Sequence, residues 1–283
     1  MAKIAFVTDS TAYLPDEFVK EHGITVVPLN LHWDEEVYKD NVDITPQAFY
    51  EKLEKSDSMP STSQPSAGEF LESFKSAAKG ADGLVVLVIS SGISGTYNSA
   101  VLAKEEFDQV PVEVIDSKVT SAGLVFMIKA MLAKVKNGGK VEDMPAVAKA
   151  VHETMGIYFV VDTLKYLHKG GRIGGASAFL GSALDLKPIL FLSEEGKIEA
   201  HEKVRTKKKA VKRLVEIAVE KAGGKKAYVG VLHANAPAEA EALKNEIASQ
   251  MDCQEIDVYP ISPVIGTHTG PGTLGVVVHT TQY

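Results

Sequence analysis

Cysteine and long apolar runs are both scarce in this sequence. The chain of 283 residues has one cysteine, Cys253, which excludes a disulfide framework and a cluster of thiolate metal ligands. No run approaches the length that spans a membrane, and the first residues have the composition of a strand rather than of a secretory signal. We therefore expect a cytoplasmic protein with no integral membrane association.

The balance of charge argues against another class of function. The chain has 30 basic and 37 acidic residues, a formal net charge of −7, which disfavours nucleic-acid binding as its main role. Hydrophobic residues make up 45% and charged residues 24%, which is typical of a globular protein with a real core. The length fits one large or two ordinary domains.

Motifs of common nucleotide and metal enzymes are also missing. There is no phosphate-binding loop of the GxxxxGK[ST] type, and none of the histidines has zinc-site spacing. Residues 270–275, GPGTLG, match GxGxxG but precede a strand instead of joining a strand to a helix. Residues 92–95, GISG, lack the GxSxG pattern of a hydrolase elbow. We expect no metal and no cofactor.

The alternation of apolar runs and helical patterns predicts an α/β protein. Three runs in the first half, residues 3–7, 84–89 and 112–115, read as strands, and each is followed by polar side chains. The strand at 84–89 is continuously apolar, as in a parallel sheet buried on both faces. Because the carboxyl ends of parallel strands meet at one edge, we expect these polar side chains to share a rim.

The second half has a different pattern. Residues 188–192 and 197–204 are expected to pair as an antiparallel hairpin around a Glu-Glu-Gly turn, which makes the second sheet mixed. The sequence therefore predicts two α/β domains. Residues 1–155 form one with a mainly parallel sheet, and residues 156–283 form one with a mixed sheet.

Three short segments have local patterns that predict their conformation. Residues 59–66, MPSTSQPS, are expected to be irregular, with Ser66 capping the helix that follows. Residues 176–186 are expected to form a helix of small residues, and residues 261–275 a loop. The apolar helix at 120–136 and the helix at 176–186 are candidate walls for an apolar ligand, although plain burial in the core is the default explanation for each residue in them.

The turn at residues 90–96, SSGISGT, is the candidate binding site. Its glycines permit a sharp turn, and its hydroxyls and backbone amides precede a helix, where anionic or polar groups bind. The alternative is that Gly92 and Gly95 only make a tight strand-to-helix connection. The residues alone leave both alternatives open.

Six segments together resemble one known family, the DegV family, which includes the fatty-acid-binding subunits of the bacterial fatty acid kinase. The resemblance covers essentially the whole chain, with the segments in the same order. They are TDS (8–10), PSTSQPS (60–66), SSGISGTYNSA (90–100), DS (116–117), LHKGGRI (167–173) and GTHTGPGTLG (266–275).

The resemblance implies a lipid-binding protein, not an enzyme, with a long-chain fatty acid between two α/β domains. Its acyl tail would be buried, and its carboxylate would be held by Thr62 and Ser94, with His268 nearby. Neighbouring loop positions are Ser63, Gly95 and Thr96. A carboxylate held by neutral hydroxyls and amides needs no permanent counter-charge.

The resemblance also implies an ATP-binding kinase subunit as a partner, which would phosphorylate the bound fatty acid. Arg172 and Arg205 match positions linked to that handover. Thr267 departs from the pattern, because some kinase-partner members have a second histidine before the one that matches His268. The basic start of the helix at 205–221 is either a solvated face or a docking surface for an acidic partner.

Two other functions remain open at this stage. The same polar rim would suit an enzyme, either an acyl ester or thioester hydrolase with Ser94 as nucleophile and His268 as base, or a small-molecule phosphotransferase. A regulatory lipid sensor would differ from a kinase subunit only in its partner.

Overall fold

A computed structural model of the chain describes residues 3–181 and 186–283, which form three sheets. A four-stranded sheet has the order β2-β1-β6-β7, and all its pairs are parallel. A six-stranded sheet, β10-β9-β8-β13-β11-β12, is mixed, and a three-stranded sheet, β4-β3-β5, is antiparallel. The predicted α/β class, with a parallel and a mixed sheet, is confirmed.

The first half supplies the parallel sheet and the small antiparallel sheet. Its strands are β1 (Ile4–Asp9), β2 (Thr25–Val27), β3 (Asn30–Trp33), β4 (Glu36–Lys39), β5 (Ser61–Ser63), β6 (Gly83–Val88) and β7 (Val112–Asp116). Its helices are η1 (Ser10–Ala12), α1 (Asp16–His22), α2 (Pro46–Lys55), α3 (Ala67–Ala77), α4 (Thr96–Glu105), α5 (Ala122–Lys136), η2 (Val141–Asp143) and α6 (Met144–Thr154).

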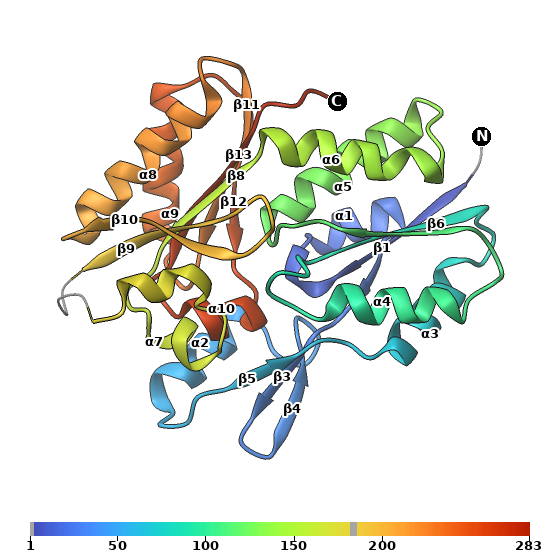
Figure 1. Cartoon of the computed structure of the whole chain (residues 1–283), viewed down its shortest axis with the longest axis horizontal. Coiled ribbons are helices and arrows are strands. Elements are labelled where there is room, and N and C mark those ends of the chain that lie inside the picture. The colour runs from blue at the N-terminus through green and yellow to red at the C-terminus, as the bar shows by residue number, and fades with distance from the viewer. Residues whose placement is uncertain (1–2, 182–185) are drawn as a thin grey trace.

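The second half supplies the mixed sheet, which begins at residue 156. Its strands are β8 (Gly156–Val160), β9 (Lys187–Leu192), β10 (Ile198–Val204), β11 (Ala227–His233), β12 (Cys253–Pro260) and β13 (Leu274–His279). Its helices are α7 (Lys165–Lys169), η3 (Gly174–Phe179), α8 (Lys207–Ala222), α9 (Pro237–Gln250) and α10 (Pro263–Thr269). Figure 1 shows the two large sheets side by side, with the β3–β4 hairpin projecting below them.

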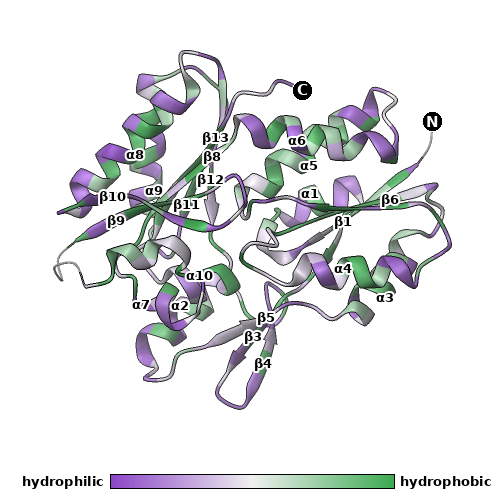
Figure 2. Cartoon of the chain, in the orientation of Figure 1, coloured by the Kyte–Doolittle hydropathy of each residue, from purple (hydrophilic) through white to green (hydrophobic). Residues whose placement is uncertain are grey.

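Helix α5 lies between the two large sheets. It is apolar almost all round and packs against both β6 and β11, so one core joins the two halves. Figure 2 shows it among the green, hydrophobic elements of the interior. On β11, Gly230 permits this approach, because a side-chain carbon there would lie 2.7 Å from the Cβ atom of Ala122. The predicted burial of this helix is confirmed.

Residues 59–66 are not wholly irregular, as we expected them to be. Residues 61–63 form β5, which pairs with β3 in the register Leu31 to Thr62. Pro60 and Pro65 flank this strand instead of interrupting it, so its amides remain available for pairing. Ser66 caps α3 as predicted, in a reciprocal capping box with Glu69.

The other two local expectations were also wrong in part. The chain at 174–179 forms the 3₁₀-helix η3, which ends at Leu180 in an extended conformation, and residues 182–185 of the predicted helix lie outside the described residues. The predicted loop at 261–275 contains helix α10, with Ser262 as its N-cap and Pro263 at its first position. A serine N-cap followed by proline is an ordinary signal for the start of a helix. The helix was not predicted because the glycines and threonines that follow are more typical of a loop.

None of the described helices combines the length and the apolarity that crossing a bilayer requires.

Candidate functional site

A pocket lies in the seam between the two halves of the chain. The space between its walls, open solvent at the mouth included, is about 790 Å³. Most of its wall is apolar, and both halves contribute to it. The apolar wall includes Leu29, Ile89 and Ile93 from the first half and Ile157, Phe159 and Leu192 from the second.

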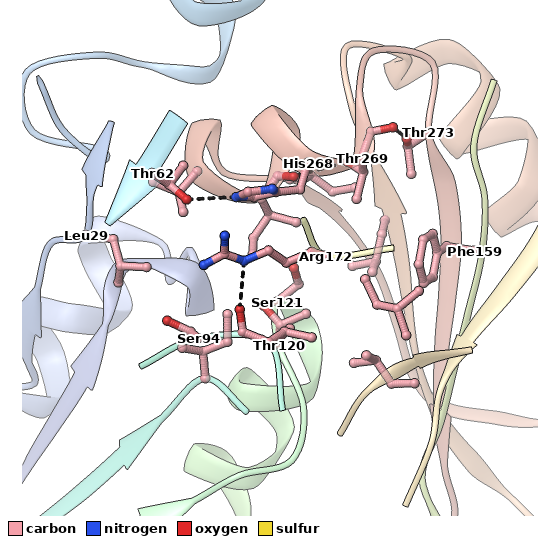
Figure 3. A pocket seen from close by; sticks show the side chains of 18 of the residues that line it. Leu29, Thr62, Ser94, Thr120, Ser121, Phe159, Arg172, His268, Thr269 and Thr273 are labelled. Carbon is pink, nitrogen blue, oxygen red and sulfur yellow. Dashed lines mark hydrogen bonds between the residues drawn. The ribbon is translucent and has the colours of Figure 1, made fainter. Parts of the chain in front are cut away.

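One region of the pocket is polar, and four separate segments build it. Thr62 comes from β5, Ser94 from the turn after β6, Arg172 from the loop after α7 and His268 from α10. Figure 3 shows the Arg172 guanidinium between the Thr62–His268 pair and Ser94. Residues more than 200 positions apart in the sequence thus face one small volume.

His268 is a neutral side chain that fixes the Thr62 hydroxyl. Its Nε2 atom lies 2.7 Å from Thr62 Oγ1. Burial, with a further contribution from the charge of Arg172, lowers the pKa of His268 to about 4, and the residue is 8% exposed. The imidazole therefore carries one proton at neutral pH.

The surroundings of Nδ1 indicate which ring nitrogen of His268 carries the single proton. Nδ1 of His268 has no hydrogen-bond partner among the described residues, and it faces the α-carbon of Gly170. A side-chain carbon at Gly170 would lie 2.1 Å from Nδ1. An N–H at Nδ1 would be buried and unsatisfied, so we assign the proton to Nε2, which donates it to Thr62 Oγ1. The Thr62 hydroxyl is then free to donate to a ligand.

Arg172 brings a positive charge to the same place. Its Nε donates to the carbonyl of Ile93 at 3.3 Å, and one terminal nitrogen donates to the carbonyl of Gly170 at 2.9 Å. Within the described part of the chain it forms no ion pair. A half-buried guanidinium without a carboxylate favours an anionic ligand. The pocket therefore offers a counter-charge, which the reasoning from neutral hydroxyls alone did not include.

Ser94 lies at the beginning of α4. Its Oγ is 2.8 Å from Thr96 Oγ1, and it accepts from the Thr96 amide at 3.3 Å. Gly95 is the N-cap residue, and a side-chain carbon there would lie 2.9 Å from the Gln64 amide nitrogen. The turn thus exposes Ser94 to the pocket, with Gly95 and Thr96 behind it.

The remaining predicted residues lie in different surroundings. Ser63 lines the pocket, but its hydroxyl is engaged by His32 Nε2 at 2.8 Å and Asn30 Nδ2 at 3.3 Å. Arg205 is exposed between β10 and α8 and does not line the pocket. The structure therefore places Arg172 with Thr62, Ser94 and His268, and leaves Arg205 outside this group.

The predicted polar rim exists, but most of it supports the turn after β6. The carboxylate of Asp9 accepts from the Ile89 amide at 2.6 Å, and that of Asp116 accepts from the Ser91 amide at 3.0 Å. Neither carboxylate lines the pocket. The ends of β1 and β7 thus hold the turn that presents Ser94.

The nucleophile–base pair of a hydrolase is not formed. Nε2 of His268 bonds to Thr62, whereas the hydroxyl of Ser94 bonds to Thr96. Within residues 3–181 and 186–283, no group of three or more His, Cys, Asp or Glu side chains could hold a metal ion.

Sequence reasoning missed Thr120, Ser121 and Gln64, which also line the pocket. A hydroxyl pair directly before a long apolar helix was the available signal for the first two. Gln64 belongs to the same hydroxyl-rich segment as Thr62. Its position beside Gly95 in the pocket is visible only in the structure.

Fold and site thus define an α/β protein with a parallel and a mixed sheet and a largely apolar pocket that contains one arginine. The sequence model of the DegV family, described as uncharacterised proteins, matches residues 3–281. A DegV domain-containing protein of Streptomyces coelicolor is 42% identical over 277 residues, covering 97% of this chain and 98% of that protein. The chain belongs to the DegV family.

Solved structures of relatives have the same fold. A DegV family protein from Thermus thermophilus, described by its fatty acid binding, superposes with a TM-score of 0.93 at 36% identity, covering 99% of this chain and 100% of that one. A stearic acid-binding protein from Eubacterium ventriosum superposes with a TM-score of 0.89 at 28% identity, covering 99% and 98%.

Proposed function

We propose that this protein binds a long-chain fatty acid, with its carboxylate among Thr62, Ser94, Arg172 and His268 and its tail along the apolar wall. The observation that carries the proposal is the guanidinium of Arg172, which has no acidic partner in the described structure and lies at the polar region of an apolar pocket. The fatty-acid-binding relatives support the same ligand class.

The two parts of such a ligand match the two parts of the pocket. A carboxylate accepts charge-assisted hydrogen bonds from all three residues, with a charged donor in Arg172 and neutral hydroxyl donors in Thr62 and Ser94. Each buried methylene contributes roughly 0.8 kcal/mol, so a 16-carbon chain gains on the order of 10 kcal/mol before entropy costs. We further infer two domains, 1–155 and 156–283, since the mixed sheet begins with β8 at Gly156. The ligand would then lie between domains.

Mass spectrometry of the purified protein tests this function directly, first under native conditions and then after organic extraction. We expect one fatty acid per chain, or stoichiometric uptake of added octadecanoic acid. A protein that is empty and also fails to bind added fatty acids would contradict the proposal.

Presentation of the bound acid to a separate ATP-binding kinase subunit is the second part of the proposal. It rests on the family resemblance and on the exposed cations near the start of α8. Lys207 already pairs with Glu239, at 3.0 Å, and Arg213 with Glu202, at 2.9 Å. Arg205, Lys208 and Lys209 are therefore the better docking candidates.

Charge reversal separates docking from binding. We expect Lys208→Glu with Lys209→Glu to lower acyl-phosphate formation with the kinase subunit while fatty acid affinity stays unchanged. Lys149→Glu, an exposed position on α6, is the matched control. Unchanged phosphorylation in the double variant would exclude this surface.

A further inference from the structure

Two further hydroxyls in the pocket form no hydrogen bond with the four residues of the proposed carboxylate site. Thr120 and Ser121 lead directly into α5, and both line the pocket. Thr120 Oγ1 is buried without a hydrogen-bond partner among the described residues. Ser121 is 3% exposed and occupies the N-cap position of α5, yet its side chain makes no capping bond. Buried hydroxyls are nearly always hydrogen-bonded, so this pair marks a place that accepts a polar group.

The backbone of Ser121 gives a second reason to look here. Its φ of 52° and ψ of −133° belong to a region that glycine adopts far more readily than serine. Glycine at this position would relieve the strain and remove the hydroxyl. The serine therefore costs stability in exchange for a hydroxyl that caps nothing within the fold.

The pair forms no hydrogen bond with the residues of the polar region around Arg172. Figure 3 shows the pair next to Ser94 and below the Arg172 guanidinium, across the pocket from His268 and Thr269 of α10. The apolar residues of the same lining include Ile157 and Phe159.

The chemistry of this place is neutral. Two hydroxyls can each donate and accept, and the amino-terminal end of α5 adds a partial positive charge that favours an acceptor oxygen. Arg172 is the one arginine or lysine along the described lining, so a second carboxylate would have no counter-charge of its own. An uncharged oxygen fits better.

We propose that Thr120 and Ser121 form a subsite for an oxygen on the acyl chain, so that the ligands of this protein include hydroxy or oxo fatty acids. The proposal rests on the proposed function. In a wholly apolar channel a chain hydroxyl would be buried unpaired and would weaken binding strongly. Here it would replace its water hydrogen bonds with bonds to Thr120 and Ser121.

Displacement of a fluorescent fatty acid, with octadecanoic acid and a positional series of hydroxyoctadecanoic acids, tests the subsite. For at least one hydroxyl position, we expect the protein to bind the hydroxy acid at least as tightly as octadecanoic acid. Thr120→Val and Ser121→Gly should each weaken binding of that acid about three- to tenfold and change octadecanoic acid affinity less than twofold.

Two features of the design guard against trivial results. Thr269→Val is the matched control, because Thr269 lines the same pocket but its hydroxyl already donates to the Ile265 carbonyl at 3.3 Å. It should leave the ratio of the two affinities unchanged. Ser121→Gly should melt no lower than the unmodified protein, which separates a lost contact from a lost fold.

Three results would overturn the subsite. One is that every hydroxy acid binds tenfold or more weakly than octadecanoic acid to the unmodified protein. Another is that the variants leave the hydroxy acid unaffected. The third is that they weaken both ligands equally, which would assign the two hydroxyls to the carboxylate site. If octadecanoic acid itself fails to bind, the proposed function fails first, and the subsite falls with it.

Discussion

The two halves of the chain contribute different chemistry to one pocket. The first half supplies neutral hydroxyls, from Thr62, Ser94, Thr120 and Ser121, and the second supplies the ionisable groups, Arg172 and His268. Hydroxyls adapt as donors or acceptors, whereas a guanidinium only donates. The difference teaches that the proposed site would take its positive charge from the second half and most of its hydroxyl donors from the first, so neither half would form that site alone.

Removal of the positive charge of Arg172 should weaken fatty acid binding more than any other single change in the pocket. We expect Arg172→Gln to raise the dissociation constant for octadecanoic acid by about 10- to 100-fold, because a hydrogen bond to a charged group is worth roughly 1.5–3 kcal/mol. Titration calorimetry measures the change. Arg205→Gln, outside the pocket, is the control and should bind normally. Equal affinities for Arg172→Gln and the unmodified protein would show that the hydroxyls suffice.

Displacement of the His268 imidazole should have the second-largest effect on fatty acid binding. Gly170 has φ of −76°, so alanine suits its backbone, but the added carbon would lie 2.1 Å from His268 Nδ1. We expect Gly170→Ala to push His268 away from Thr62 and to weaken fatty acid binding about tenfold, roughly the loss of one or two hydrogen bonds. Gly68→Ala, whose added carbon meets nothing closer than 3.9 Å, is the control. Unaltered binding by Gly170→Ala would mean that His268 does not position Thr62.

Loss of single hydroxyls should have the smallest effect on affinity. Thr62→Val and Ser94→Ala should each weaken binding about two- to tenfold, because each removes one neutral donor while the charge of Arg172 still holds the carboxylate. Thr62→Ser keeps the hydroxyl and should bind nearly as the unmodified protein does. Full affinity in both Thr62→Val and Ser94→Ala would remove these residues from the carboxylate site.

The two halves also differ in how a buried group makes stability depend on pH, with His268 in the second half and Asp40 in the first. The pKa of His268 is lowered to about 4 by burial, so the unfolded chain takes up this proton first as pH falls below about 6.5, and folding loses stability. Asp40, buried beside the start of α10, changes the stability of the fold with pH in the opposite direction. Burial raises the pKa of Asp40 to about 7, so the folded protein loses stability as pH rises from about 4 to 7.

Urea unfolding at pH 5 and 7.5 tests these signs. Asp40→Asn keeps an oxygen for the Val264 amide but cannot titrate, so its stability relative to the unmodified protein should be greater at pH 7.5 than at pH 5, by roughly 2 kcal/mol. His268→Gln should reduce the loss of stability between pH 6.5 and 4.5. The same relative stability of Asp40→Asn at both pH values would mean that this carboxyl titrates normally in the fold.

Elements with strong local patterns were predictable. The continuous apolar run of β6, the apolar helix α5 and the hairpin of β9 and β10 were all found from sequence, because periodicity and turn residues decide them locally. Elements decided by long-range pairing were missed. Strand β5 forms because β3 offers its edge, and residues 174–179 stop short of a long helix where the chain packs against β10.

The candidate site divides in the same way. The motifs located Thr62, Ser94, Arg172 and His268 individually, and family resemblance linked three of them to a carboxylate. That Arg172 faces the same pocket, and that Thr120 and Ser121 lie across from His268, follows from no spacing in the chain.

The sequence by itself determined the α/β class, the turn after β6 and the chemical types available for binding, since these depend on neighbours within a few residues. Only the tertiary structure decided which of those groups meet. It placed Gly170 against Nδ1 of His268 and Thr62 against Nε2, and it left Arg172 without a carboxylate in the described structure. Charge, burial and hydrogen bonding at this pocket depend on contacts between residues up to 206 positions apart, which local sequence cannot specify.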